Sequence, residues 1–104
     1  MKIIFCIAPS HLIFKKELHD LFILKNLTSF VVANGTSFLV KRKFQFRYIS
    51  SETFLRGSCG FYLIFRPELI PHNAEKDSMR MVLNARIASR DLIAWDWKIL
   101  EREP

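Results

Sequence analysis

The side chains best suited to chemistry in this sequence are the aromatic rings of residues 56–66, which read Arg-Gly-Ser-Cys-Gly-Phe-Tyr-Leu-Ile-Phe-Arg. In a β-strand the side chains alternate in direction, so Phe61, Leu63 and Phe65 would share one face and the intervening tyrosine and isoleucine the other. Both faces would then be apolar. A core explains one of them, and the second needs a covering element or a ligand with flat rings. RNA bases are such a ligand, because they stack on aromatic side chains presented by a sheet.

A second candidate surface is basic and lies along residues 38–48. Its apolar residues share one parity: Phe38, Val40, Phe44, Phe46 and Tyr48. Only Arg42 interrupts this apolar series, and Lys41, Lys43, Gln45 and Arg47 would point the other way. Same-side neighbours on a strand are about 6.6 Å apart, close enough to meet successive phosphates of an extended single strand. The alternative is an ordinary solvated edge face, on which lysine discourages unwanted strand pairing.

No constellation of residues indicates an enzyme or a metal site. His11, His19 and His72 could supply general acid–base groups for RNA cleavage, but their positions form no motif. The sequence also lacks a glycine-rich phosphate loop, a zinc-protease helix and a nucleophile elbow. Cys6 and Cys59 lack metal-ligand spacing and are too few for a disulfide framework, so we expect free thiols in a reducing compartment. We therefore expect no catalytic residues, no cofactor and no metal.

The length and charge of the chain limit the class of protein. Its 104 residues suffice for one domain, half of them are hydrophobic, and 10 are phenylalanine, so a core can form. The net charge of +6 favours a polyanionic partner. The apolar run at residues 3–8 stops at Pro9, which is short for a signal peptide, and no run approaches the ~18 residues of a membrane span. We expect no membrane association and an intracellular protein, nuclear or cytoplasmic.

Hydrophobic periodicity predicts alternating strands and helices. Strands are expected at residues 3–8, 29–33, 38–48, 60–66 and 93–99, and helices at residues 11–24 and 74–89. Ser10 would cap the first helix, and Asn73 or Asp77 the second. Asn34-Gly35 predicts a hairpin with a type I′ turn, which needs positive φ twice.

Several of these segments resemble the RNA recognition motif. Residues 56–66 resemble its longer signature, in which a basic residue and glycine lead into a Gly-Phe-x-aromatic-aliphatic run. Residues 4–9 (Ile-Phe-Cys-Ile-Ala-Pro) resemble its shorter signature, residues 16–22 its first helix with a Leu-Phe ending, and residues 73–76 the start of its second helix. The resemblance covers nearly the whole chain.

This resemblance implies an α+β fold, the ferredoxin-like split βαβ sandwich with the order β-α-β-β-α-β. A four-stranded antiparallel sheet would carry both helices on one face. The single domain would span residues 1–104, with an extra strand or hairpin inserted between the second and third core strands (residues 36–57) and a tail at residues 101–104.

The resemblance also implies a set of RNA-binding residues. Phe5, Phe61, Leu63 and Phe65 would form the stacking face, and alternation then turns a second set towards the helices: Ile4, Cys6, Tyr62, Ile64, Trp95 and Trp97. Asp96 and Lys98 would flank the stacking face. Lys41, Lys43 and Arg47 would lie in a connection that commonly touches RNA, and Arg56 would lead into the longer signature. These ten residues predict a small domain that binds single-stranded RNA.

A narrower resemblance is to the small subunit of the nuclear cap-binding complex. It is carried by Cys59-Gly60-Phe61 and by Trp95-Asp96-Trp97. In that family an aromatic residue on the first strand stacks on methylated guanine and acidic residues on the last strand bind its edge, and Phe5 and Asp96 occupy the matching positions. Lys98 stands in place of the second acid.

The alternative function is a protein–protein interaction module with the same fold, acting as a subunit or inhibitor of a larger complex. Leu63 stands where the RNA-binding family usually has an aromatic residue, which weakens base stacking. An apolar sheet face or the helices could hold a protein partner, and an exposed basic strand could add to a partner's sheet.

Overall fold

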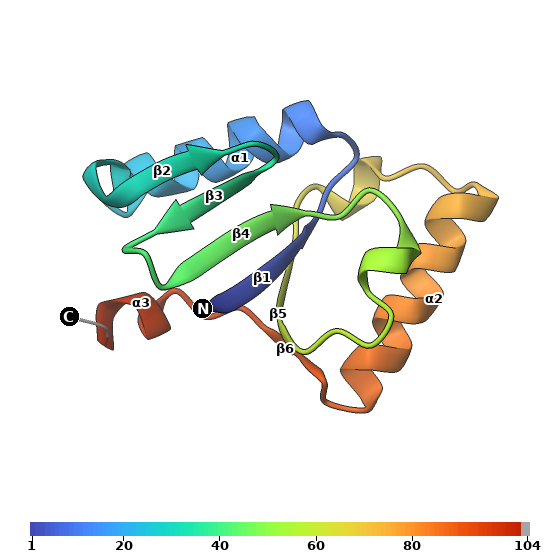
Figure 1. Cartoon of the computed structure of the whole chain (residues 1–104). Coiled ribbons are helices and arrows are strands. Elements are labelled where there is room, and N and C mark those ends of the chain that lie inside the picture. The colour runs from blue at the N-terminus through green and yellow to red at the C-terminus, as the bar shows by residue number, and fades with distance from the viewer. Residues whose placement is uncertain (103–104) are drawn as a thin grey trace.

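A computed structural model describes residues 1–102 of the chain (Figure 1). These residues form six strands, three α-helices and three short 3-10 helices. In chain order the elements are β1 (Lys2–Ile7), α1 (His11–Leu24), η1 (Thr28–Phe30), β2 (Val31–Asn34), β3 (Ser37–Val40), β4 (Phe44–Tyr48), η2 (Glu52–Phe54), β5 (Gly60–Ile64), η3 (Pro67–Leu69), α2 (Ala74–Ala88), β6 (Leu92–Ala94) and α3 (Lys98–Arg102).

The strands form one mixed sheet in the order β2-β3-β4-β1-β5-β6. β1 is central, as its two apolar faces predicted, and pairs in parallel with β4 and β5. β6 adds in parallel to β5, while β2, β3 and β4 form an antiparallel meander. The α+β class is confirmed, but the strand order and directions differ from the predicted antiparallel split βαβ sheet. Residues 36–57, which were predicted to be an insertion, contribute to the centre of the sheet, because β4 pairs directly with β1.

The two helices cover opposite faces of the sheet, so the prediction that both lie on one face is wrong. The physical reason is the handedness of parallel connections, which are right-handed. The connection that contains α1 leads from β1 to β4, and the connection that contains α2 leads from β5 to β6 in the other direction across the sheet. Two right-handed crossovers in opposite directions place their helices on opposite faces. The central strands are therefore covered on both sides.

The face under α1 holds a largely aromatic core. Ser10 caps α1 as predicted, accepting a hydrogen bond from the Ile13 N–H (3.2 Å). The helix buries a stripe of Phe14, Leu18 and Phe22 against Ile4, Cys6, Phe44, Phe46 and Trp95. The Phe22 ring meets the Phe46 ring edge-on at 5.5 Å between centroids. Such pairs add about 0.5–1.5 kcal/mol beyond the area they bury.

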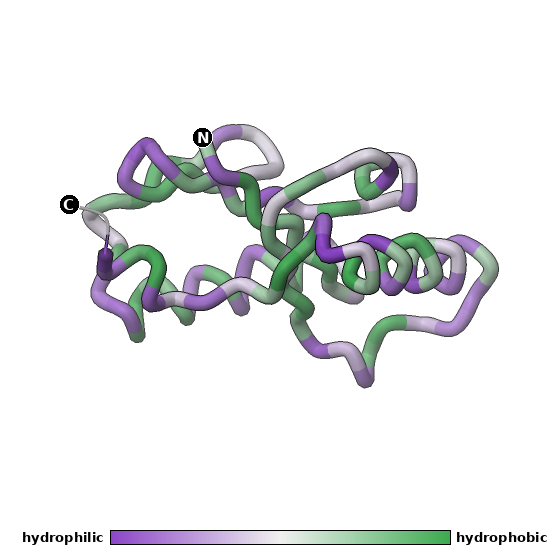
Figure 2. Tube along the Cα trace, turned by 90° about the horizontal axis from the view of Figure 1, so that it is seen from below, coloured by the Kyte–Doolittle hydropathy of each residue, from purple (hydrophilic) through white to green (hydrophobic). Residues whose placement is uncertain are grey.

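The face under α2 holds the second core. Asn73, one of the two predicted caps, accepts a hydrogen bond from the Lys76 N–H (2.8 Å). Met79 and Leu83 are buried in a cluster with Phe5, Ile7, Ile49, Leu55, Ile70 and Leu92. Around the turns of α2, at the right of Figure 2, hydrophobic and hydrophilic residues alternate as expected for a helix that buries one stripe.

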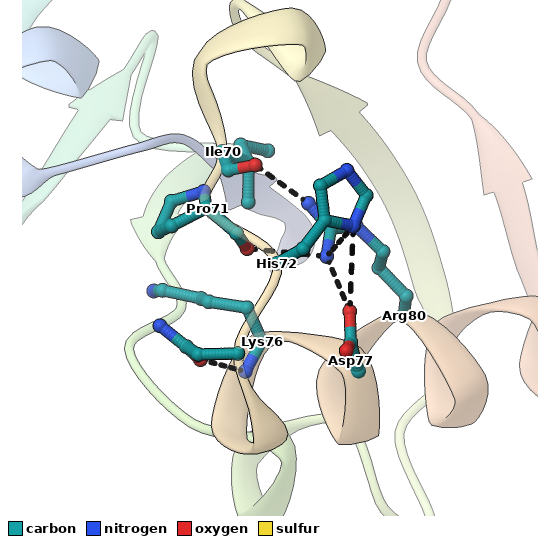
Figure 3. A network of polar contacts seen from close by, with 7 residues as sticks. Ile70, Pro71, His72, Lys76, Asp77 and Arg80 are labelled. Carbon is teal, nitrogen blue, oxygen red and sulfur yellow. Dashed lines mark hydrogen bonds and ion pairs between the residues drawn. The ribbon is translucent and has the colours of Figure 1, made fainter.

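Arg80 of α2 holds the segment that follows β5 through hydrogen bonds (Figure 3). Its guanidinium donates to the carbonyl oxygens of Ile70 (2.9 Å) and Pro71 (3.2 Å) and to the carboxylate of Asp77 (2.8 Å). His72 lies against the same group, with Nδ1 3.6 Å from the Asp77 carboxylate. The cluster satisfies backbone carbonyls that no strand or helix partner reaches, which is a structural role.

Two hairpins replace the single predicted strand at residues 38–48. The predicted hairpin at Asn34-Gly35 is present, but its central residues are Gly35 and Thr36, and of these only Gly35 has positive φ (62°), so the turn is not type I′. The second hairpin turns at Lys41 and Arg42, whose φ values are 54° and 58°. Val40 then pairs with residue 44 across a loop of three residues, and an odd loop length preserves the period-two pattern.

The last predicted strand ends early. β6 stops at Ala94, and Ile93 is 58% exposed instead of facing the helices with the tryptophans. The chain then turns so that Trp95 is buried in the core under α1, and the Asp96 side chain accepts a hydrogen bond from the Lys98 N–H (3.0 Å) at the start of α3. Of the predicted tail, residues 101–102 belong to α3 and residues 103–104 lie outside the described residues.

Candidate nucleic-acid interface

The structure does not assemble the predicted stacking face. Phe5 is only 4% exposed beneath α2, and Phe65 is 6% exposed in the core under α1. Register places Phe5 beside Tyr62, so Phe5 and Phe61 lie on opposite faces of the sheet. Phe61 and Leu63 are half-buried with the α1 core. The predicted facing is wrong because α2 covers the face that was expected to be bare.

The remaining residues of that prediction serve other contacts. Arg56 is exposed and pairs with Glu52 (3.2 Å) in the segment before β5. Asp96 caps α3, and Lys98 is the exposed first residue of that helix. Since Phe5 is buried, the Phe5–Asp96 pair that the cap-binding resemblance implied is not available to a ligand.

The structure does leave one sheet surface uncovered, the side of β2, β3 and β4 that faces away from α1. We call this surface the open face. Figure 1 shows α1 behind β2 and β3, with no helix in front of them in the part of the chain that the structure describes. Val32 on this face is 61% exposed, and Leu39 and Gln45 are half-exposed, whereas Phe38 and Phe46 point into the opposite, covered side.

One end of the open face is apolar with a cationic rim. Here a hollow of about 850 Å³ is lined by Phe30, Val32, Leu39, Lys41 and Arg42, together with Ser29. The Lys41 ammonium lies 5.4 Å from the centre of the Phe30 ring and donates to the carbonyl oxygen of residue 100 (3.3 Å). Arg42 is exposed. Phe30 itself is 51% exposed, so about half of this aromatic residue is accessible beside two positive charges.

The other end of the open face is polar and ordered by a chain of hydrogen bonds. Arg47 Nη2 donates to Gln45 Oε1 (3.1 Å), Gln45 Nε2 donates to Ser37 Oγ (3.0 Å), and Ser37 Oγ donates to the Asn34 carbonyl oxygen (2.9 Å). The chain crosses from β4 through β3 to the end of β2, so it holds the Arg47 guanidinium in place. Arg47 does project away from the core under α1, as the alternation of residues 38–48 predicted, and Lys43 is exposed in the turn before β4.

The electrostatics of the open face are one-sided. Neither of its two hollows is lined by an Asp or a Glu. In the sequence, no acidic residue occurs between Asp20 and Glu52, although this stretch contains Lys25, Lys41, Arg42, Lys43 and Arg47. This acid-free stretch is the sequence signal that marks β2, β3 and β4 as the basic half of the sheet, and the sequence analysis above missed it.

Other classes of site find no support in the described residues. Residues 1–102 contain no helix with the length and apolar character needed to span a bilayer. Within the same residues, no three His, Cys, Asp or Glu side chains are grouped so that they could hold a metal ion. Comparison with protein-family models, with curated proteins and with solved structures finds no match to this chain.

Proposed function

We propose that this chain is a domain that binds single-stranded RNA through the open face. The observation that carries the proposal is an uncovered, partly apolar sheet surface whose two hollows are lined by cations and, among the described residues, by no Asp or Glu. Single strands bind where bases can lie against flat side chains while cations follow the backbone. RNA remains the ligand that the sequence indicated, but the contact surface moves from β1 and β5 to β2, β3 and β4.

The spacing of the groups supports an extended ligand. Arg42 lies in the turn that leads into β4 and Arg47 lies near the end of that β-strand, so a ligand that contacts both must extend along β4. Between them lie Leu39 and Gln45 on neighbouring strands, which offer one apolar and one hydrogen-bonding surface. A single-stranded RNA bound along β4 would thus contact Phe30 and Arg42 at one end and Arg47 at the other.

The backbone of the second hairpin supports a role for its cations. Lys41 and Arg42 both occupy the left-handed region, where a residue other than glycine costs about 1–2 kcal/mol. A turn of this kind is formed more easily by Asn-Gly. Lys41 contacts Phe30 and the carbonyl oxygen of residue 100, whereas a ligand contact would account for a long cation at Arg42.

The first test is Arg42→Gly, measured by fluorescence anisotropy of a labelled single-stranded RNA at several salt concentrations. We expect weaker binding, and a log–log salt slope that is smaller by about 0.7, the value for one lost phosphate contact. Because glycine relieves the positive φ, the variant should unfold at a higher urea concentration than the native chain, so the loss of binding cannot come from unfolding.

The matched control is Arg90→Gly. Arg90 is also exposed and also has positive φ (65°), but it follows α2 at the far end of the sheet. The Arg90→Gly variant should have the same RNA affinity and the same salt slope as the native chain. If both variants change the slope equally, only the net charge matters and the open face is not the site. A native chain that binds no RNA at 50 mM salt would remove the proposal altogether.

The aromatic contact is tested with Phe30→Ala. One stacked base is worth about 1–3 kcal/mol, so the affinity for RNA should fall by that amount. The control is Ile93→Ala, which removes an apolar side chain of similar exposure from β6, the opposite edge strand. Equal effects of the two variants would contradict a specific contact at Phe30.

A second candidate function, protein binding, is favoured by the edge of the sheet. β2 is an edge strand, and its exposed residues Val32, Ala33 and Asn34 include no lysine or proline to discourage pairing. A partner strand could add there. Val32→Lys separates the two functions, because it adds a cation to the open face: it should tighten RNA binding, whereas it should abolish capture of a protein partner that packs on β2. RNA binding that does not tighten, together with loss of the protein partner, would favour the protein interface.

A further inference from the structure

We propose that the hollow at the polar end of the open face binds a nucleoside monophosphate unit, with its terminal phosphate on Arg47 and its base against Tyr48 and Phe54. This inference rests on the proposed function and names the part of the RNA that the open face would recognise. The hollow has a volume of about 700 Å³, within the ~300–1,000 Å³ range of small-molecule sites.

The position of the hollow favours the terminal nucleotide of a bound RNA. It lies where β4 finishes, between the β2–β3 turn and the segment that leads into η2. Ser50 and Phe54 from that segment form its far wall, and Asn34 and Gly35 from the turn form another. An RNA that extends along β4 from Arg42 would meet these walls, so its terminal nucleotide would lie in the hollow.

Arg47 supplies the phosphate contact. A guanidinium has five N–H donors, and among the described residues Arg47 uses one of them, on Gln45. The hydrogen-bond chain through Gln45 and Ser37 orients the group in advance, which reduces the entropy lost on binding. A terminal phosphate has more free oxygens than an internal one and can accept two parallel N–H bonds from such a fork. No carboxylate lines the hollow to oppose it.

The aromatic residues supply the surface for the base. Phe54 is 51% exposed on one wall, and Tyr48 lies on another. The His11 ring packs edge-on against Tyr48 at 5.3 Å between centroids and fixes the position of the tyrosine. Among the described residues, His11 Nε2 is buried without a hydrogen-bond partner. His11 also lines the hollow.

The experiment compares three RNA oligonucleotides of the same sequence: one with a 5′-phosphate, one with a 3′-phosphate and one with hydroxyls at both ends. We expect the native chain to bind one phosphorylated end about tenfold more tightly than the unphosphorylated oligonucleotide, the gain of a hydrogen-bonded ion contact. Equal affinities for all three would overturn the inference and leave the proposed function standing. Failure of all three to bind would remove the proposed function.

Matched variants locate the effect. Arg47→Lys keeps the charge but loses the planar fork, so the phosphorylated complex should lose more affinity than the unphosphorylated one and the preference for a phosphorylated end should fall to about twofold or less. Phe54→Ala removes a contact with the base, which all three oligonucleotides share, so it should weaken all three complexes by a similar factor. Arg42→Gly, at the other end of the open face, should weaken all three complexes equally and keep the preference. A preference that survives Arg47→Lys would overturn the assignment to this hollow.

Free nucleotide is the second source of the same chemistry, and adenosine 5′-monophosphate is its probe. Titration followed by NMR should shift the resonances of His11 and Tyr48 in the native chain and not in Arg47→Lys. Shifts with the mononucleotide but no binding of any oligonucleotide would assign the hollow to a free nucleotide. No shifts and no end preference would overturn the inference.

Discussion

Replacing Phe5 with alanine separates the observed arrangement of the sheet from the one that the RNA-binding resemblance implied. In the structure Phe5 is 4% exposed and belongs to the core under α2, together with Leu55, Met79, Leu83 and Leu92. Truncating a buried phenylalanine costs about 3–5 kcal/mol, the lost transfer free energy plus the cavity. In the implied arrangement the same ring would stack on a base, and its loss would cost binding instead.

The assay is urea unfolding followed by tryptophan fluorescence. With a slope near 1.5 kcal/mol per molar urea, a loss of about 4 kcal/mol lowers the midpoint by about 2.5 M. Domains of this kind have only about 5–15 kcal/mol of stability, so Phe5→Ala could unfold the chain outright. Phe5→Leu keeps most of the volume and should cost at most about 1.5 kcal/mol. A larger loss for alanine than for leucine is the signature of a filled core position.

Phe54→Ala is the matched control, because it removes the same ring from a half-exposed position and should change stability by about 0.5 kcal/mol or less. The reasoning is refuted if Phe5→Ala costs less than about 1 kcal/mol of stability and weakens RNA binding by the ~1–3 kcal/mol of one stacked base. That result would mean that α2 does not cover this face of β1.

Three further predictions concern the backbone and the titratable groups. Gly60→Ala should lower the free energy of unfolding by at least about 2 kcal/mol, since φ is 146° and an added Cβ would lie 2.6 Å from a carbonyl oxygen of β1. Gly35→Ala has open space around it and should cost about 1 kcal/mol for its positive φ alone. Equal losses in urea unfolding would contradict the close approach at Gly60. A thiol reagent should modify Cys59 in the folded chain and Cys6 only after unfolding, because Cys6 is buried and burial raises the pKa of its thiol; two rapidly reacting thiols in the native chain would contradict this burial. Burial also raises the pKa of Tyr48 above its ordinary value, so the stability that its neutral side chain contributes is complete below about pH 10 and is lost as the pH rises through the raised pKa. The Tyr48→Phe variant should therefore lose less stability than the native chain between pH 8 and pH 11. An identical loss in both proteins would refute a raised pKa at Tyr48.

Local interactions were enough to predict several elements. The limits of α1, its buried stripe, its cap at Ser10 and the cap of α2 at Asn73 depend on residues within one or two helical turns. The Asn34-Gly35 hairpin depends on the φ freedom of one glycine. The alternation along β3 and β4 correctly separated the residues under α1 from Gln45 and Arg47. In each case the sequence records the physical cause at short range.

The partners of the strands were decided only by the tertiary structure. The apolar side chains of residues 61–65 showed that the second face of this strand needs either a covering element or a ligand, but the pattern does not say which of the two it is. Whether β1 pairs in parallel with β4 and β5 depends on contacts between residues about 40–60 positions apart. The right-handed crossovers then place α2 over Phe5, where a stacked base had been expected, and leave β2, β3 and β4 bare on that side. The aromatic residues that looked functional are core, and the surface available to a ligand is the one that no helix crosses.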